Sequence, residues 1–126
     1  MKVLIADDSD ALVKRLVAAI AGIDGVEVIG RAATVVEAER AIRALRPDVV
    51  ILDLHMPGGH GIDILDGLRR DGLAPAVIVL TNYDHPQFRR KSLEKGARFF
   101  FDKSTDFDMV AEAVSMLARY REEDDA

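Results

Sequence analysis

Residues 49–53 read VVILD, four consecutive aliphatic residues that end in an aspartate. An aliphatic run without polar alternation predicts a strand that is buried on both faces, as in a parallel sheet. Similar runs at residues 3–6 and 76–80 end at polar residues, Asp7 and Thr81. Parallel strands need long crossover connections, so the pattern favours an α/β fold.

Helical patterns lie between these runs. Five helices are predicted, at residues 11–21, 34–46, 62–70, 86–96 and from Thr105 onward. Thr34-x-x-Glu37 and Thr105-x-x-Asp108 resemble capping boxes at helix starts, and Pro86 suits a first helical turn. With further strands at residues 26–29 and 98–101, the sequence predicts a (βα)₅ domain whose helices cover both faces of one sheet.

Composition limits the classes of function. The chain has 126 residues, which fits one domain, and its formal charge of −5 argues against direct binding to nucleic acid. It contains no cysteine, which excludes disulfides, thiol catalysis and zinc–thiolate sites. No run approaches the roughly 18 apolar residues of a membrane helix, so we expect no membrane span and a cytoplasmic protein.

Polar residues follow four of the predicted strands. Asp7 and Asp8 follow the first, Asp53 the third, Thr81 the fourth, and Lys103 lies just past the fifth. Ligands of such sheets bind beyond the carboxyl ends of the strands. Three carboxylates at one edge repel one another, and Mg²⁺, which prefers oxygen ligands, removes that repulsion. An aspartate beside Mg²⁺ and an ammonium group is well placed to attack phosphorus as a nucleophile.

Each of these residues also has an ordinary structural interpretation. Asp8 or Ser9 alone is often a helix N-cap, Asp53 alone a turn residue, Thr81 alone a turn hydroxyl, and an isolated lysine is usually solvated. Their joint occurrence at the correct strand ends favours the functional interpretation.

From residue 2 to about residue 120, the chain resembles the receiver domains of bacterial two-component response regulators. The matching motifs are the acidic pair after residues 3–6, the stretch 47–61, Leu80-Thr81, and Gly96-Ala97 with Asp102-Lys103. The resemblance implies a doubly wound, flavodoxin-like (CheY-like) sheet of strand order 2-1-3-4-5. It also implies a receiver domain over residues 1–121, followed by an acidic tail at 122–126.

The resemblance implies a role for each site residue. Asp53 is expected to accept a phosphoryl group from a phosphohistidine on a sensor histidine kinase or a histidine phosphotransfer protein. Asp7, Asp8, Asp53 and the backbone carbonyl of His55 are expected to hold Mg²⁺.

Thr81 and Lys103 are expected to bind the phosphoryl oxygens, and Phe100 to move inward when Thr81 turns. The surface of the helix at 86–96, the strand at 98–101 and the last helix then changes shape. The protein is therefore expected to be a signalling switch and not an enzyme that turns over a substrate. It would control an output protein or an effector domain outside this sequence, and the resemblance allows a homodimer on phosphorylation.

Three departures from the family pattern involve four positions. Ser104 follows Lys103 where many receivers have proline, which puts the turn geometry in doubt, and Phe100 replaces a common tyrosine. His55 and Tyr83, two residues beyond Asp53 and Thr81, are expected to shield the acyl phosphate and lengthen its lifetime.

Other classes remain open at this stage. A magnesium-dependent phosphatase of the haloacid dehalogenase type has its nucleophile after the first strand, in an Asp-x-Asp pattern that residues 6–10 fit only partly. A flavodoxin-like flavin carrier needs a Ser/Thr-rich loop where the chain has acids. A receiver that has lost phosphorylation conflicts with the complete residue set.

Overall fold

The computed structural model describes residues 1–82 and 85–125, with residues 122–125 as helix backbone only. The elements run in the order β1 (Lys2–Ala6), α1 (Asp10–Ile20), β2 (Glu27–Ala32), α2 (Val35–Leu45), β3 (Val49–Leu52), α3 (Ile62–Arg70), β4 (Ala76–Thr81), α4 (Pro86–Glu94), β5 (Phe99–Asp102) and α5 (Phe107–Asp125). The alternation confirms the predicted (βα)₅ organisation.

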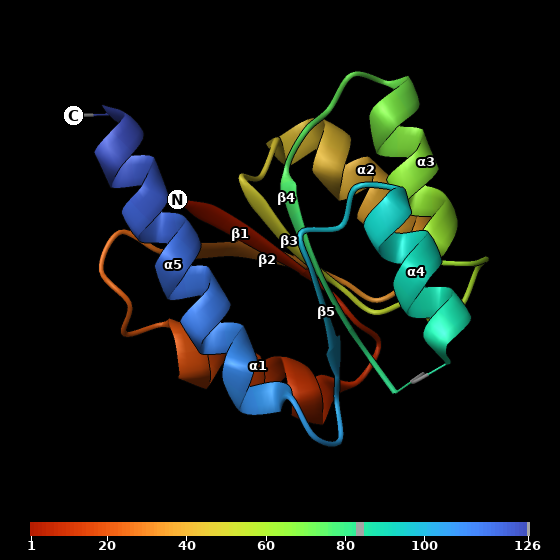
Figure 1. Ribbon diagram of the computed structural model, residues 1–126, viewed down its shortest axis with the longest axis horizontal. Coiled ribbons are helices and arrows are strands. Elements are labelled where there is room, and N and C mark those ends of the chain that lie inside the picture. Colours follow the sequence, from red (N-terminus) through yellow and green to blue (C-terminus); the bar gives the residue numbers. More distant parts are fainter. Residues whose placement is uncertain (83–84, 126) are drawn as a thin grey trace.

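The five strands form one parallel sheet in the order β2-β1-β3-β4-β5. Helices α1 and α5 cover one face, and α2, α3 and α4 cover the other (Figure 1). The predicted fold class and strand order are therefore confirmed. Because all strands point the same way, their carboxyl ends meet at one edge of the sheet.

The strands are buried on both faces because alternate side chains enter two separate cores. Leu4 and Val50 pack toward α2 and α3, whereas Ile5 and Ile51 pack toward α1 and α5. All four side chains are at most 1% exposed. This explains why the central strands read as continuous aliphatic runs. No helix within the described residues is long and apolar enough to cross a bilayer.

Side-chain caps fix where α1 and α2 begin. The Ser9 hydroxyl accepts a hydrogen bond from the N–H of Leu12, and the Thr34 hydroxyl accepts one from the N–H of Glu37. The Glu37 carboxylate accepts from the N–H of Ala33. A full capping box would use the N–H of Thr34 itself, so the reciprocal bond is displaced by one residue.

The second strand and the last helix have different boundaries from the predicted ones, and the other elements end within about two residues of the prediction. The second strand continues to Ala32 because its pairing with β1 skips Ile29: Val3 lies opposite Val28, and Leu4 lies opposite Gly30. This bulge hides the alternation that would have revealed the full strand.

The last helix starts at Phe107 rather than Thr105. The N–H groups of Thr105 and Asp106 donate to the carbonyl of Asp102, so Thr105 belongs to a turn. The helix backbone continues to Asp125, into the acidic segment 122–126; the division into a receiver domain and an acidic tail stays a prediction.

Candidate functional site

Asp53 lies directly beyond β3, and its side chain is 4% exposed. Its Oδ1 accepts hydrogen bonds from the Thr81 hydroxyl at 3.1 Å and from the N–H of His55 at 3.0 Å. Its Oδ2 accepts from the Lys103 ammonium at 3.0 Å. Three donors from three different strand ends therefore converge on one buried carboxylate.

Asp7 is the second buried acid of the site. The Lys103 ammonium lies 2.8 Å from Asp7 Oδ2 and bridges it to Asp53. The N–H of Ser9 donates to Asp7 Oδ1 at 2.8 Å. The ammonium of Lys103, whose side chain is only 12% exposed, thus neutralises part of the charge of two carboxylates.

Burial and charge pairing shift the pKa values of Asp7 and Lys103 in opposite directions. Burial raises the pKa of the Asp7 carboxyl above its usual value, although Lys103 and the Ser9 N–H act against that shift. Burial alone would lower the pKa of Lys103, but the hydrogen bonds and charges of Asp7 and Asp53 outweigh it and raise that pKa. The lysine therefore stays charged, and the site holds more negative than positive charge.

The acidic residues fit a hard divalent cation. Oxygen atoms of Asp7, Asp8 and Asp53 all lie within 4.8 Å of one another, with Asp8 exposed to solvent. Carboxylate oxygens with one solvent-accessible side suit Mg²⁺, which binds few protein ligands and keeps several waters. The predicted residues are thus brought together in a set that such an ion can use.

The remaining predicted residues surround this centre. The side chain of His55 is exposed, and its ring lies edge-on to Phe88 of α4, with centroids 6.3 Å apart. Phe100 is buried in the core beneath α4, with the Arg89 guanidinium 5.8 Å from its ring centroid. The expected shielding by His55 and Tyr83 stays a prediction, and Tyr83 lies outside the described residues.

The departure at Ser104 does not keep Lys103 away from the acids. The Lys103–Ser104 peptide bond is trans. The Ser104 hydroxyl and N–H both donate to the Asp102 carboxylate, which shapes the turn after β5. Within that turn the Lys103 ammonium still reaches both Asp7 and Asp53.

Sequence reasoning missed Arg31, which lies beside the site near the end of β2. Its Nε donates to the backbone carbonyl of Asp7 at 3.1 Å, and its guanidinium pairs with the carboxylate of Asp10. The predicted second strand ended at Ile29, two residues before this arginine. A prediction that carried the strand through the bulge would have placed Arg31 at the same edge as the acids.

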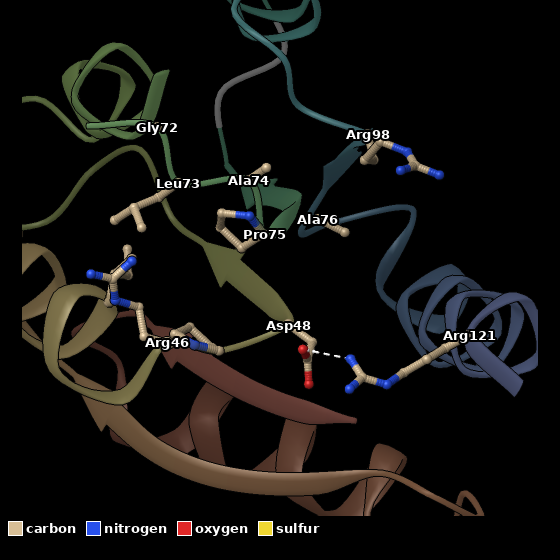
Figure 2. Close-up of a pocket in the computed structure, with 11 residues that line it drawn as sticks. Arg46, Asp48, Gly72, Leu73, Ala74, Pro75, Ala76, Arg98 and Arg121 are labelled. Carbon is tan, nitrogen blue, oxygen red and sulfur yellow. Dashed lines mark ion pairs between the residues drawn. The ribbon is translucent and has the colours of Figure 1, made fainter. Parts of the chain in front are cut away.

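A hollow of about 490 Å³ lies at the opposite edge, among the amino ends of β3, β4 and β5 (Figure 2). Arg46, Arg98 and Arg121 stand around it, and Arg121 pairs with Asp48. Asp48 also accepts a hydrogen bond from the N–H of Lys2. This acid is therefore already partnered, and the residues that line the hollow do not include a cluster of carboxylates, hydroxyl and ammonium like the one at the carboxyl edge.

Comparison with known proteins agrees with this geometry. The model of the response regulator receiver domain family matches residues 3–115. An uncharacterized transcriptional regulatory protein of Bacillus subtilis, YhcZ, is 37% identical over 106 residues, which cover 84% of this chain and 50% of that protein. The chain spans about half the length of the curated relatives it matches.

Solved structures show the same architecture. The signal receiver domain of the putative response regulator NarL from Mycobacterium tuberculosis has a TM-score of 0.84 and 29% identity, covering 94% of this chain and 95% of that one. A CheX–CheY–BeF₃–Mg²⁺ complex from Borrelia burgdorferi has a TM-score of 0.83 and 30% identity, covering 93% and 88%. These matches give the phosphatase and flavin-carrier alternatives no support.

Proposed function

Because the chain belongs to the response regulator receiver domain family, we propose that Asp53 is its phosphoacceptor and that Asp7, Asp8 and Asp53 hold Mg²⁺. The chain is a receiver domain of two-component systems, whose members accept a phosphoryl group on an aspartate. The convergence of Thr81, Lys103 and the acidic oxygens on the buried Asp53 carboxylate carries the assignment.

The proposed reaction is one displacement at phosphorus. A carboxylate oxygen of Asp53 forms a bond to phosphorus while the P–N bond of a phosphohistidine breaks, and the bonding electron pair stays on the imidazole nitrogen. The Thr81 hydroxyl and the Lys103 ammonium, which now bind Asp53, are in reach to donate to the transferred oxygens. Bound Mg²⁺, with the carbonyl of His55 as a further ligand, would offset the negative charge gathered there.

The phosphoryl group then acts as a switch. It adds roughly −1.5 to −2 charge and new acceptor oxygens beside Thr81. Phe100 is two residues from Asp102, the strand partner of Thr81, so the two sites share the β4–β5 pair. We infer that Thr81 turns toward the phosphoryl group, that Phe100 moves inward, and that the surface of α4, β5 and α5 changes as a result. A partner, an effector domain or a second copy would bind this surface.

The proposed partners follow from the same chemistry. The phosphodonor is a sensor histidine kinase or a histidine phosphotransfer protein. YhcZ, about twice as long as its matched region, is described as a transcriptional regulatory protein, which supports an effector domain as the output. Residues 1–121 are the proposed receiver unit, acting in the cytoplasm as a switch without turnover of an external substrate.

The decisive test is the intact mass of the protein after incubation with acetyl phosphate and Mg²⁺. We expect one added phosphoryl group on the wild type and none on Asp53→Asn. Asp24→Asn, which changes an exposed aspartate far from the site in sequence, is the matched control and should be phosphorylated normally. An unmodified wild type, or a phosphorylated Asp53→Asn, would contradict the proposal. Sustained hydrolysis of a small phosphate ester would instead favour an enzyme.

A further inference from the structure

Arg31 connects β2 to both ends of the segment that carries two of the proposed metal ligands. Its Nε donates to the carbonyl of Asp7, and its guanidinium pairs with the carboxylate of Asp10, the first residue of α1. Asp8 lies between these two points. The Arg31 side chain is 32% exposed, so it lies partly against the protein surface.

The same strand also holds the other side of Asp7. The N–H of Asp7 donates to the carbonyl of Ala32 at 2.8 Å. Both peptide groups of Asp7 are therefore fixed by β2, one through its backbone and the other through Arg31. The Ser9 N–H in turn fixes the Asp7 carboxylate. Orientation of this carboxylate thus depends on how firmly the segment from Asp7 to Asp10 is held.

The chemistry of arginine suits this role. A planar guanidinium presents several donors in a fixed fork, so one side chain can serve a carbonyl and a carboxylate at once, whereas an ammonium is a point charge on a flexible stem. The Arg31 guanidinium is paired with the Asp10 carboxylate. The two charges offset each other, and the pair adds no net charge beside the acids.

We propose that Arg31 is a positioning residue for magnesium binding, which holds Asp7 and Asp8 in the arrangement that the ion requires. The inference rests on the proposed function, since it assumes that these acids hold Mg²⁺. It assigns Arg31 no contact with the ion or with the phosphoryl group.

The test uses a charge-neutral double variant, Arg31→Gln with Asp10→Asn. Its matched control is Arg43→Gln with Asp71→Asn, an exposed pair that joins α2 to the end of α3 away from the site. Amide hydrogen exchange is measured without metal at Ser9, whose N–H donates to Asp7 Oδ1. The Mg²⁺ dissociation constant is measured by titration of amide NMR shifts.

In the Arg31/Asp10 variant we expect faster exchange at the Ser9 amide. We also expect roughly three- to tenfold weaker Mg²⁺ binding, as for the loss of one partly exposed charged contact. The Arg43/Asp71 variant should keep the wild-type values. The single variant Arg31→Gln separates geometry from charge. If the arginine acted only by repelling the cation, this variant would bind Mg²⁺ more tightly and the double variant would match the wild type.

That charge-only pattern overturns the proposal. Unchanged exchange at the Ser9 amide, or faster exchange with unchanged Mg²⁺ affinity, overturns it as well. A wild-type protein that binds no Mg²⁺ would overturn the proposed metal site itself. Equal binding by the wild type and the double variant would overturn only the role of Arg31.

Discussion

Gly61 lies directly before α3, and we predict that even the methyl group of alanine cannot fit there unless the surrounding backbone shifts. A Cβ atom added there would lie 2.7 Å from Leu54 Cα and 2.8 Å from the carbonyl oxygen of Asp53. The backbone angles of Gly61, φ −57° and ψ −29°, suit any residue. The cost of Gly61→Ala is therefore a steric clash and not a strained backbone.

The clash cannot be relieved by rotating a side chain, because the atoms in contact belong to the backbone. The chain must move by about 0.7 Å before the closest pair reaches the ordinary contact distance of 3.4 Å. Overpacking of this kind costs about 2–3 kcal/mol. For a domain of this size that lowers the melting temperature by roughly 6–12 °C.

The displaced backbone carries the proposed phosphoacceptor. The N–H of Gly61 also donates to the carbonyl of Leu54 at 3.1 Å, so the clash strains a bond that holds the loop after β3. We therefore expect Gly61→Ala to slow phosphorylation by acetyl phosphate as well as to destabilise the fold, both measured on the same preparation.

The control is Gly67→Ala in the middle of α3, where the nearest atom to an added Cβ is the flexible Arg70 Nη2 at 3.5 Å. Alanine is the better helix former, so this variant should gain about 0.5–1 kcal/mol. The stabilities of Gly61→Ala and Gly67→Ala are measured by urea denaturation and calorimetry. A Gly61→Ala protein within about 0.5 kcal/mol of the wild type, a typical surface effect, would refute the steric reasoning.

Two further predictions concern charge. Lys103→Met leaves the buried carboxylates of Asp7 and Asp53 without their shared cation, so we expect the free energy of unfolding to fall by about 2–4 kcal/mol at pH 7, measured by urea denaturation. Mg²⁺ should restore part of this stability, and a variant that Mg²⁺ does not stabilise would count against a metal at these acids. Partial burial alone would raise the pKa of Asp48, but its backbone hydrogen bond and Arg121 hold that pKa below the usual range. Its ionised form therefore stabilises the fold above the unfolded pKa of about 3.9 and loses this effect as the pH falls through the folded value. Asp48→Asn should cost about 1 kcal/mol at pH 7, because Arg121 is half exposed. A difference in stability from the wild type that does not narrow as the pH falls below the unfolded pKa of about 3.9 would contradict this assignment.

Most of the fold was predictable because each local signal agreed with the sheet. The runs at 3–6, 49–52 and 76–80 are buried on both faces, and this burial leaves a pattern in sequence. The second strand was predicted too short because its bulge at Ile29 breaks the alternation, and Thr105 resembled a cap although its N–H is used in a turn.

The sequence predicted which residues lie together in the site. It did not predict which of their atoms form hydrogen bonds and ion pairs. The direction of the strands brings Asp7, Asp53, Thr81 and Lys103 to one edge. That Lys103 bridges two acids depends on the turn after β5, fifty residues beyond Asp53. The contact of Arg31 with the carbonyl of Asp7 was not predicted, because no spacing rule connects these two residues.

Helix α5 starts four residues after Lys103 and runs past Arg121, which meets Asp48 at the opposite edge of the sheet (Figures 1 and 2). Its 19 residues span about 28 Å. Ions screen electrostatic fields over about 8 Å at physiological ionic strength. The charge of a phosphoryl group on Asp53 is therefore largely screened at the far end of α5. A domain attached there would respond to phosphorylation through a movement of α5 or through contact with the altered surface of α4, β5 and α5, and not through the added charge itself.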